Sequence, residues 1–154
     1  MNTRIGKTIF AAAAVMMCAL VLSAVLALPA FTQGISLGVK GGILSGEFSV
    51  FTEAFLAGPV SASLSIGVQS SSLSISAWTT IYFLPSTQIV APYLGFGANV
   101  LLFSSGPQAS LMLIGGVRSS PFRWLSVFME GVLLARLPSF NPALDIRVGL
   151  AARF

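Results

Sequence analysis

The sequence predicts an all-β protein: an eight-stranded antiparallel up-and-down transmembrane β-barrel, preceded by an N-terminal signal helix. Hydrophobic residues make up 55% of the 154 residues and charged residues only 8%, whereas roughly 25% of a typical soluble domain is charged. From Ile35 onward apolar residues recur at every second position, a period that is typical of strands. These segments are about ten residues long, the length at which a tilted strand crosses a bilayer.

The chain begins with a leader of the secretory type. Arg4 and Lys7 precede an uncharged stretch over residues 8–30, and small residues close that stretch, as in a cleavable signal peptide. We expect a signal peptide over residues 1–30, cleaved after Ala27 or Ala30, and an outer-membrane barrel domain over residues 31–154. An uncleaved membrane helix is the alternative, because about 20 apolar residues suffice to span a bilayer.

Eight segments with the strand period follow the leader, and short clusters of Gly, Ser and Pro separate them. The segments are Gly34–Leu44, Phe48–Ala57, Val60–Gln69, Leu73–Leu84, Val90–Phe103, Gln108–Arg118, Trp124–Arg136 and Ala143–Phe154. Only helices and closed barrels can span lipid, because an open sheet edge would leave backbone groups unsatisfied there. Frequent Gly and Ser with a period of two argue against helices. Eight is also the smallest even strand number of single-chain outer-membrane barrels.

The two faces of each strand differ in polarity, and the third segment shows this best. One face carries Val60, Ala62, Leu64, Ile66 and Val68, and the other Ser61, Ser63, Ser65, Gly67 and Gln69. The sixth and seventh segments divide in the same way. In a membrane barrel the apolar face contacts lipid and the other face lines the interior.

Charged residues share the phase of the interior face. We expect these in the lumen: Lys40, Glu53, Arg118, Glu130, Arg136, Asp145, Arg147 and Arg153. A basic residue on the lipid side at mid-membrane would cost roughly 2–4 kcal/mol. Inside, we expect Glu53 and Glu130 to neutralise some of the basic residues Lys40, Arg118 and Arg147. Three arginines stand near strand ends, where solvent is the alternative environment: Arg118, Arg136 and Arg153.

Large apolar side chains also share the interior phase. They are Phe51, Phe55, Trp78, Tyr82, Phe128, Val132 and Leu134. Side chains just fill the interior of an eight-stranded barrel, so a plugged core is expected. A pocket or lateral path for an apolar ligand is the alternative.

Aromatic residues cluster near the predicted strand ends on one rim. From this cluster we expect an interfacial girdle that includes Tyr82, Phe83, Tyr93 and Trp124, with Phe122 and Phe154 beside them. Aromatic side chains at the level of the lipid headgroups are typical of membrane barrels.

Three stretches resemble the small outer-membrane β-barrels of the OmpA/OmpX-like superfamily. They are APYLGFGANV (91–100), GGVRSSPFRWLSVFMEGVLLARL (115–137) and DIRVGLAARF (145–154). The resemblance covers residues 73–154 well and residues 34–69 by pattern only. It implies an exported protein in the outer membrane of a diderm bacterium, with outer-membrane lipid, the secretion apparatus and the barrel-assembly machinery as partners. In this family a terminal aromatic with alternating apolar residues is an assembly signal, a role that would fall on Ile146, Val148, Leu150 and Phe154.

Two features differ from the larger members of that superfamily. The predicted outward loops (44–47, 69–72, 104–107 and 136–142) are short, which disfavours adhesin or receptor roles. No peptidoglycan-binding domain is expected after the barrel.

The sequence offers little for catalysis. It contains no histidine, and the single cysteine, Cys18, lies in the leader, so histidine acid–base chemistry and thiolate metal sites are not expected in the mature chain. The carboxylates show no spacing that indicates an acid–base pair. The expected mature charge, six basic against four acidic residues, is too small to indicate nucleic-acid binding. We therefore predict no enzyme activity, no metal and no cofactor.

The resulting functional prediction is an integral outer-membrane barrel with a non-enzymatic structural role and a lumen filled by side chains. One alternative is the passage or binding of small apolar molecules through the barrel. Another is a secreted, soluble, lipocalin-like barrel, which would require a polar outer face. The sequence does not determine an oligomeric state.

Overall fold

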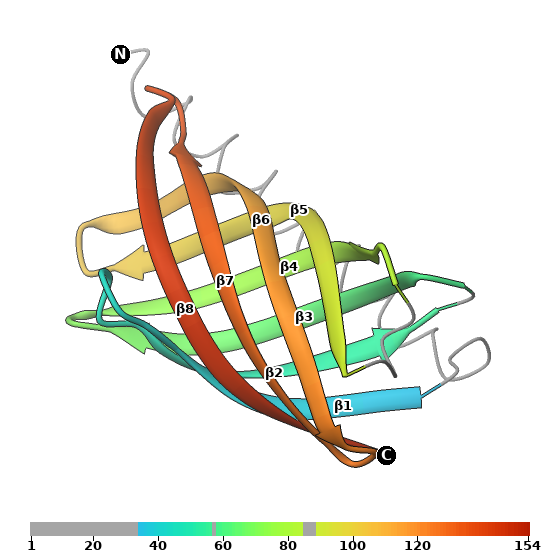
Figure 1. Cartoon of the computed structure of the whole chain (residues 1–154). Helices are drawn as coiled ribbons and strands as arrows, with labels where there is room; N and C mark the ends of the chain where they lie inside the picture. The colour runs from blue at the N-terminus through green and yellow to red at the C-terminus, as the bar shows by residue number, and fades with distance from the viewer. Residues whose placement is uncertain (1–33, 57, 85–88) are drawn as a thin grey trace.

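The alternating segments form a closed barrel of eight antiparallel strands in sequence order, with β1 hydrogen-bonded to both β2 and β8. A computed structural model describes residues 34–56, 58–84 and 89–154, and its strands wind around one axis (Figure 1). The strands are β1 (Gly34–Gly42), β2 (Phe48–Phe55), β3 (Val60–Gln69), β4 (Ser72–Tyr82), β5 (Val90–Phe103), β6 (Gly106–Phe122), β7 (Leu125–Arg136) and β8 (Asn141–Arg153). The predicted fold is confirmed for this part of the chain. The predicted signal helix, with its cleavage sites at Ala27 and Ala30, lies outside the described residues.

The largest difference from the predicted segments is the length of β6. The stretch after Arg118 was expected to be a turn, but β6 continues to Phe122, and its register with β7 shifts between Ser119 and Phe122. Pro121 lies within this shift. Proline lacks a backbone hydrogen-bond donor and is tolerated in a sheet where the ladder is interrupted. The strand therefore continues past Pro121, although proline usually ends a strand.

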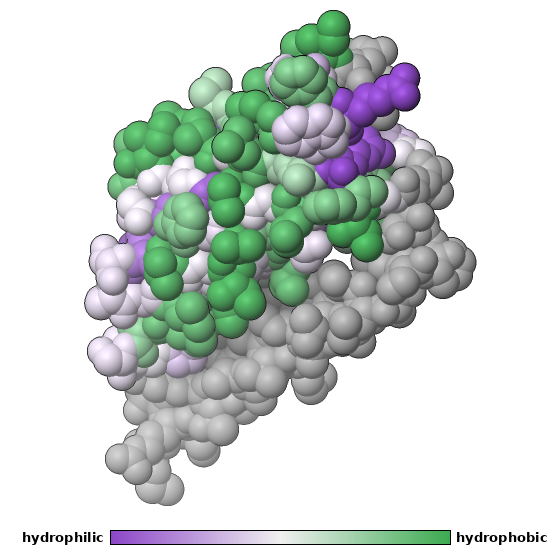
Figure 2. All heavy atoms as spheres, turned by 90° about the horizontal axis from the view of Figure 1, so that it is seen from below, coloured by the Kyte–Doolittle hydropathy of each residue, from purple (hydrophilic) through white to green (hydrophobic). Residues whose placement is uncertain are grey.

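The outer face of the barrel is apolar along all eight strands. Ile66, Leu113 and Leu150 are about half exposed. By contrast, Ser65, which precedes Ile66 and points to the other face, is 2% exposed. Figure 2 shows one side of the molecule, on which hydrophobic side chains make up much of the coloured surface. In the described ranges no helix is long and apolar enough to cross a membrane.

A glycine on the inner face of β8 makes room for the aromatic core. A Cβ atom on Gly149 would overlap the Phe128 ring and would lie 2.6 Å from the Val39 carbonyl oxygen. By contrast, a Cβ on Gly131 would meet only the Gly115 carbonyl oxygen, at 3.9 Å. The two glycines therefore make a matched pair for a packing test.

We expect Gly149→Ala to lower the free energy of unfolding by about 1–3 kcal/mol, because overpacking forces neighbouring groups to move. Gly131→Ala should change it by much less. Urea unfolding of the barrel in lipid vesicles measures both values. Equal effects of the two substitutions would contradict the close packing of Phe128 on β8.

Candidate functional site

The lumen contains two ion pairs near its centre, each joining distant strands. Lys40 Nζ on β1 donates a hydrogen bond to Glu130 Oε1 on β7 at 3.4 Å. Arg118 Nη2 on β6 lies 2.6 Å from Glu53 Oε2 on β2. The four residues are no more than 5% exposed. Each charge is thus removed from water and faces an opposite charge.

Hydroxyl groups complete the coordination of both carboxylates. Ser61 and Tyr82 donate to Glu53 Oε1 at 2.6 and 2.8 Å. Tyr93 donates to Glu130 Oε2 at 2.9 Å. A buried ion pair offsets its desolvation only when hydrogen bonds satisfy the remaining polar atoms, and these hydroxyls supply such bonds.

Aromatic rings fill the space around the two cations. Lys40 Nζ lies 3.8 Å from the centroid of the Trp78 ring, and Arg118 lies 5.3 Å from that of Tyr82. Phe51 and Phe128 meet edge to face at 5.4 Å between centroids. Cation–π attraction strengthens when the pair is desolvated, so these rings stabilise the two buried charges.

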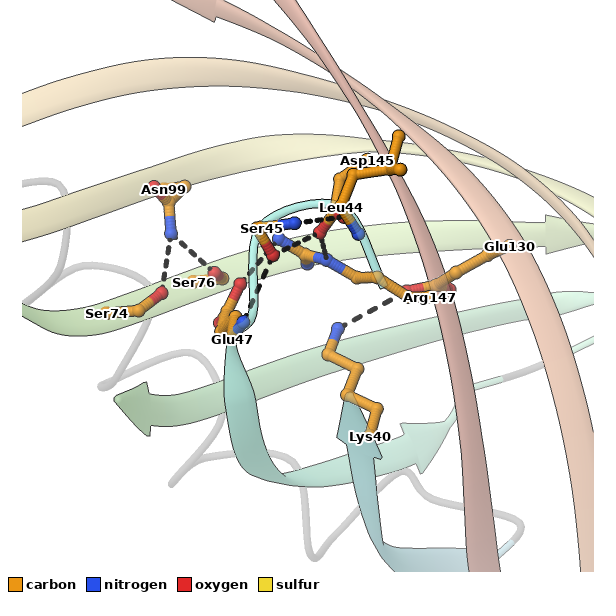
Figure 3. Close-up of polar contacts among 10 residues, drawn as sticks. All are labelled: Lys40, Leu44, Ser45, Glu47, Ser74, Ser76, Asn99, Glu130, Asp145 and Arg147. Carbon is orange, nitrogen blue, oxygen red and sulfur yellow. Dashed lines mark hydrogen bonds and ion pairs between the residues drawn. The ribbon is translucent and has the colours of Figure 1, made fainter. Parts of the chain in front are cut away.

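A third ionic cluster lies at the end of the barrel opposite Phe154, which we call the far mouth. Arg147 Nη2 donates to Glu47 Oε2 at 2.8 Å, and Arg147 Nε donates to Asp145 Oδ2 at 3.1 Å. Figure 3 shows this cluster at the turn between β1 and β2. All three side chains are buried, with 4% exposure or less.

The opposite wall of the lumen is lined by small polar residues. Asn99 Nδ2 on β5 lies 2.9 Å from the hydroxyl oxygens of Ser74 and Ser76 on β4 and donates to both (Figure 3). These residues are almost fully buried. This wall is therefore held by neutral hydrogen bonds rather than by charges.

The structure places six residues of the expected charge set in the lumen: Lys40, Glu53, Arg118, Glu130, Asp145 and Arg147. Arg136 ends β7 and is exposed, so for this residue the solvent alternative holds rather than the interior position. Arg153 is partly exposed and lies over the Phe55 ring at 4.4 Å.

Glu53 and Glu130 neutralise two of the three basic residues named for them, as expected, and the third has other partners. Glu53 and Glu130 pair with Arg118 and Lys40, and Arg147 instead binds Glu47 and Asp145. Glu47 is not among the residues expected in the lumen, because it stands in a predicted turn. Ser49 and Phe51 point into the lumen, and Glu47 continues the same alternation two residues earlier, so this alternation could have predicted its position.

Two members of the expected aromatic girdle lie inside the barrel instead. Tyr82 and Tyr93 are 3% and 5% exposed, and they are register partners across β4 and β5. Both share the inward phase of their strands, so their hydroxyls reach the lumen carboxylates rather than lipid headgroups. The other two members, Phe83 and Trp124, are about 60% exposed, and Trp124 stacks on Phe122 at 5.8 Å.

The residues of the expected assembly signal lie on the outer face. Ile146, Val148 and Leu150 are 37–49% exposed, and Phe154 is 80% exposed. The Phe154 backbone amide donates to the Ile35 carbonyl at 2.8 Å, so the last residue extends the pairing of β8 with β1. Recognition of these residues by the assembly machinery stays a prediction.

The chain thus folds as a closed eight-stranded antiparallel barrel with an apolar outer face, the fold that the sequence predicted. Solved structures share this fold. The N-terminal β-barrel domain of OprF from Pseudomonas aeruginosa matches with a TM-score of 0.71 at 12% identity, over 80% of this chain and 99% of that chain. Neisserial surface protein A matches with a TM-score of 0.53 at 12% identity, over 79% and 94%.

A de novo designed transmembrane β-barrel also matches, with a TM-score of 0.57 at 12% identity, over 80% of this chain and 97% of that chain. No family model matches the sequence, and no curated protein matches it. Similarity at 12% identity establishes the fold alone.

Proposed function

We propose that this protein is an integral outer-membrane barrel with a non-enzymatic, structural role and a lumen sealed by its own side chains. The observation that carries the proposal is the packing of the lumen. The central cavity measures about 10 Å³, and its lining includes Phe51, Trp78, Glu53, Arg118 and Glu130. A cavity of this size has room for about one water molecule.

The chemistry of the lumen supports a structural rather than a catalytic role. The lumen carboxylates Glu47, Glu53, Glu130 and Asp145 all lie within 3.4 Å of a basic nitrogen. Carboxylates fixed in this way hold strands together, and no histidine is available in the chain to act as a general base.

The outer face supports a membrane location. Leu113, Met129 and Phe96 expose more than half of their surface, and a soluble lipocalin-like barrel would carry polar residues there. By their names, the solved neighbours are a β-barrel domain, a surface protein and a designed transmembrane β-barrel. We therefore place the protein in the outer membrane of a diderm bacterium, exported by the leader over residues 1–30, with Ile146, Val148, Leu150 and Phe154 as the segment read during assembly.

Passage of small apolar molecules through the barrel receives no support from the lumen. Such a molecule would have to pass Glu53, Arg118 and Glu130, which line the central cavity. Separating one ion of a buried pair from its partner costs free energy, because it leaves an uncompensated charge. The described lumen thus favours a plug over a path.

Reconstitution in planar bilayers tests the sealed lumen. We expect no steady conductance from the wild-type barrel and no uptake of an apolar dye by vesicles that contain it. A double variant, Trp78→Ala with Phe128→Ala, removes two plugging rings and serves as the positive control that should leak small ions. Steady channels from the wild-type protein would contradict the proposal.

A further inference from the structure

The turn between β1 and β2 is fastened to the last strand by side chains about 100 residues away in the sequence. Asp145 Oδ1 accepts hydrogen bonds from the backbone amides of Leu44 and Ser45, at 3.2 and 3.1 Å. Asp145 Oδ2 accepts a bond from Ser45 Oγ at 2.8 Å. One carboxylate therefore binds three donors of the turn, as Figure 3 shows.

Arg147 provides a second connection between the same two elements. Its guanidinium joins Glu47 of the turn to Asp145 of its own strand. The Glu47 backbone amide also donates a hydrogen bond to Ser45 Oγ at 3.2 Å. We call these five residues, Leu44, Ser45, Glu47, Asp145 and Arg147, the mouth clasp.

The mouth clasp stands at the seam where the barrel closes. The β1–β8 ladder runs from Ser36 to Gly42 and is the shortest of the eight ladders, whereas the β5–β6 ladder runs from Val90 to Phe103. Four of the nine residues of β1 are glycine, and glycine weakens a strand because it has no side chain to pack. The seam is thus a short and glycine-rich ladder, and hydrogen bonds of Ile43 and Phe154 extend it at its two ends.

A glycine at the end of β1 leaves space for the side chains of the mouth clasp. Gly42 is the last residue of β1, and a Cβ atom there would overlap Ser45 Oγ and would lie 2.5 Å from Asp145 Oδ2. The Ile43 amide donates to the Ile146 carbonyl at 2.7 Å, which carries the seam one residue beyond the strand. A side chain at position 42 would occupy the space that the carboxylate and hydroxyl now fill.

We propose that the mouth clasp is a closure device: it fixes the first hairpin to the last strand, holds the β1–β8 seam in register and folds the turn over the far mouth. Opening of the barrel at the far mouth then starts with release of the clasp. The other end of the seam, where Phe154 pairs with Ile35, stays closed longer.

Amide hydrogen exchange in lipid nanodiscs tests this device residue by residue. Asp145→Ala should speed exchange of the Leu44, Ser45 and Ile43 amides by about tenfold to a hundredfold, the factor that corresponds to losing hydrogen bonds to a charged acceptor. Exchange of the Phe154 amide should change by less than about threefold. Unchanged exchange at Leu44 and Ser45 would overturn the proposal.

Asn99→Ala is the matched control, because it removes two buried hydrogen bonds across β4 and β5 without touching the clasp. It should leave Leu44, Ser45 and Ile43 unchanged. Equal acceleration of these amides by Asn99→Ala would show a general loss of stability and would reject a local device.

Gly42→Ala keeps every charge and displaces the clasp by its methyl group alone. It serves as the second variant, together with the milder Asp145→Asn, in case Asp145→Ala does not assemble. Faster exchange at Leu44 and Ser45 in both variants would support the clasp, and wild-type rates in both would overturn it.

Discussion

Replacing Glu53 with alanine is expected to lower the free energy of unfolding by about 3–5 kcal/mol, the usual cost of removing one partner of a buried ion pair. Arg118 would keep its charge at 5% exposure with no carboxylate at 2.6 Å. Ser61 and Tyr82 would also lose their acceptor. Urea unfolding in lipid vesicles measures the loss, and migration of the unboiled protein on a gel reports the folded fraction.

A double variant separates the charge effect from simple loss of packing. Glu53→Ala combined with Arg118→Met removes both charges, and it should recover a large part of the stability, because replacing a whole buried pair with apolar groups is often neutral. Thr52→Ala, at the neighbouring outward position, removes only the hydrogen bond of 3.4 Å from Thr52 Oγ1 to the Ser36 carbonyl, so it should cost about 1 kcal/mol or less. A small effect of Glu53→Ala would contradict the role of this pair in the lumen.

Replacing Leu113 with arginine is expected to cost about 2–4 kcal/mol, the penalty for a basic side chain at the bilayer midplane. Leu113 lies near the middle of β6 and is 55% exposed on the apolar outer face. The arginine would therefore lie among acyl chains, far from the headgroups. Refolding into vesicles at graded urea concentrations measures the penalty.

Val68→Arg is the depth control for this experiment. Val68 is equally exposed, at 57%, but it lies one residue before the end of β3, where the penalty should fall to about 0–1 kcal/mol. Equal penalties at positions 113 and 68 would argue against a membrane around the barrel. A lipid-dissolved quencher should also reach a spin label at position 113.

The expected effects at Glu53 and Leu113 both depend on which face of a strand each residue occupies. The sequence alone determined those faces, because side chains alternate between the two sides of a strand with a period of two. It placed Leu64 and Leu113 outside and Lys40 and Glu130 inside. It also determined the strand order, since eight short segments joined by brief turns can close only as an up-and-down barrel.

The two-residue alternation does not determine how deep in the barrel each inward residue lies, or which residue it contacts. The sequence gives no reason why Arg147 should bind Glu47 rather than Glu130, because that choice depends on the stagger between strands around the barrel. Phase assigned Tyr82 to the lumen, and its position near a strand end assigned it to the rim. In the closed barrel the side chain is 3% exposed and its hydroxyl donates to Glu53, so it lies in the lumen.

The alternation of apolar and polar residues determined the barrel and its two surfaces, because period and length are local properties of the chain. Closure of the sheet decided the contacts inside, because it joins β1 to β8 and brings Ser45 against Asp145 across 100 positions of sequence. The identities of the ion pairs and the mouth clasp are therefore properties of the closed barrel, and the strands considered one by one do not contain them.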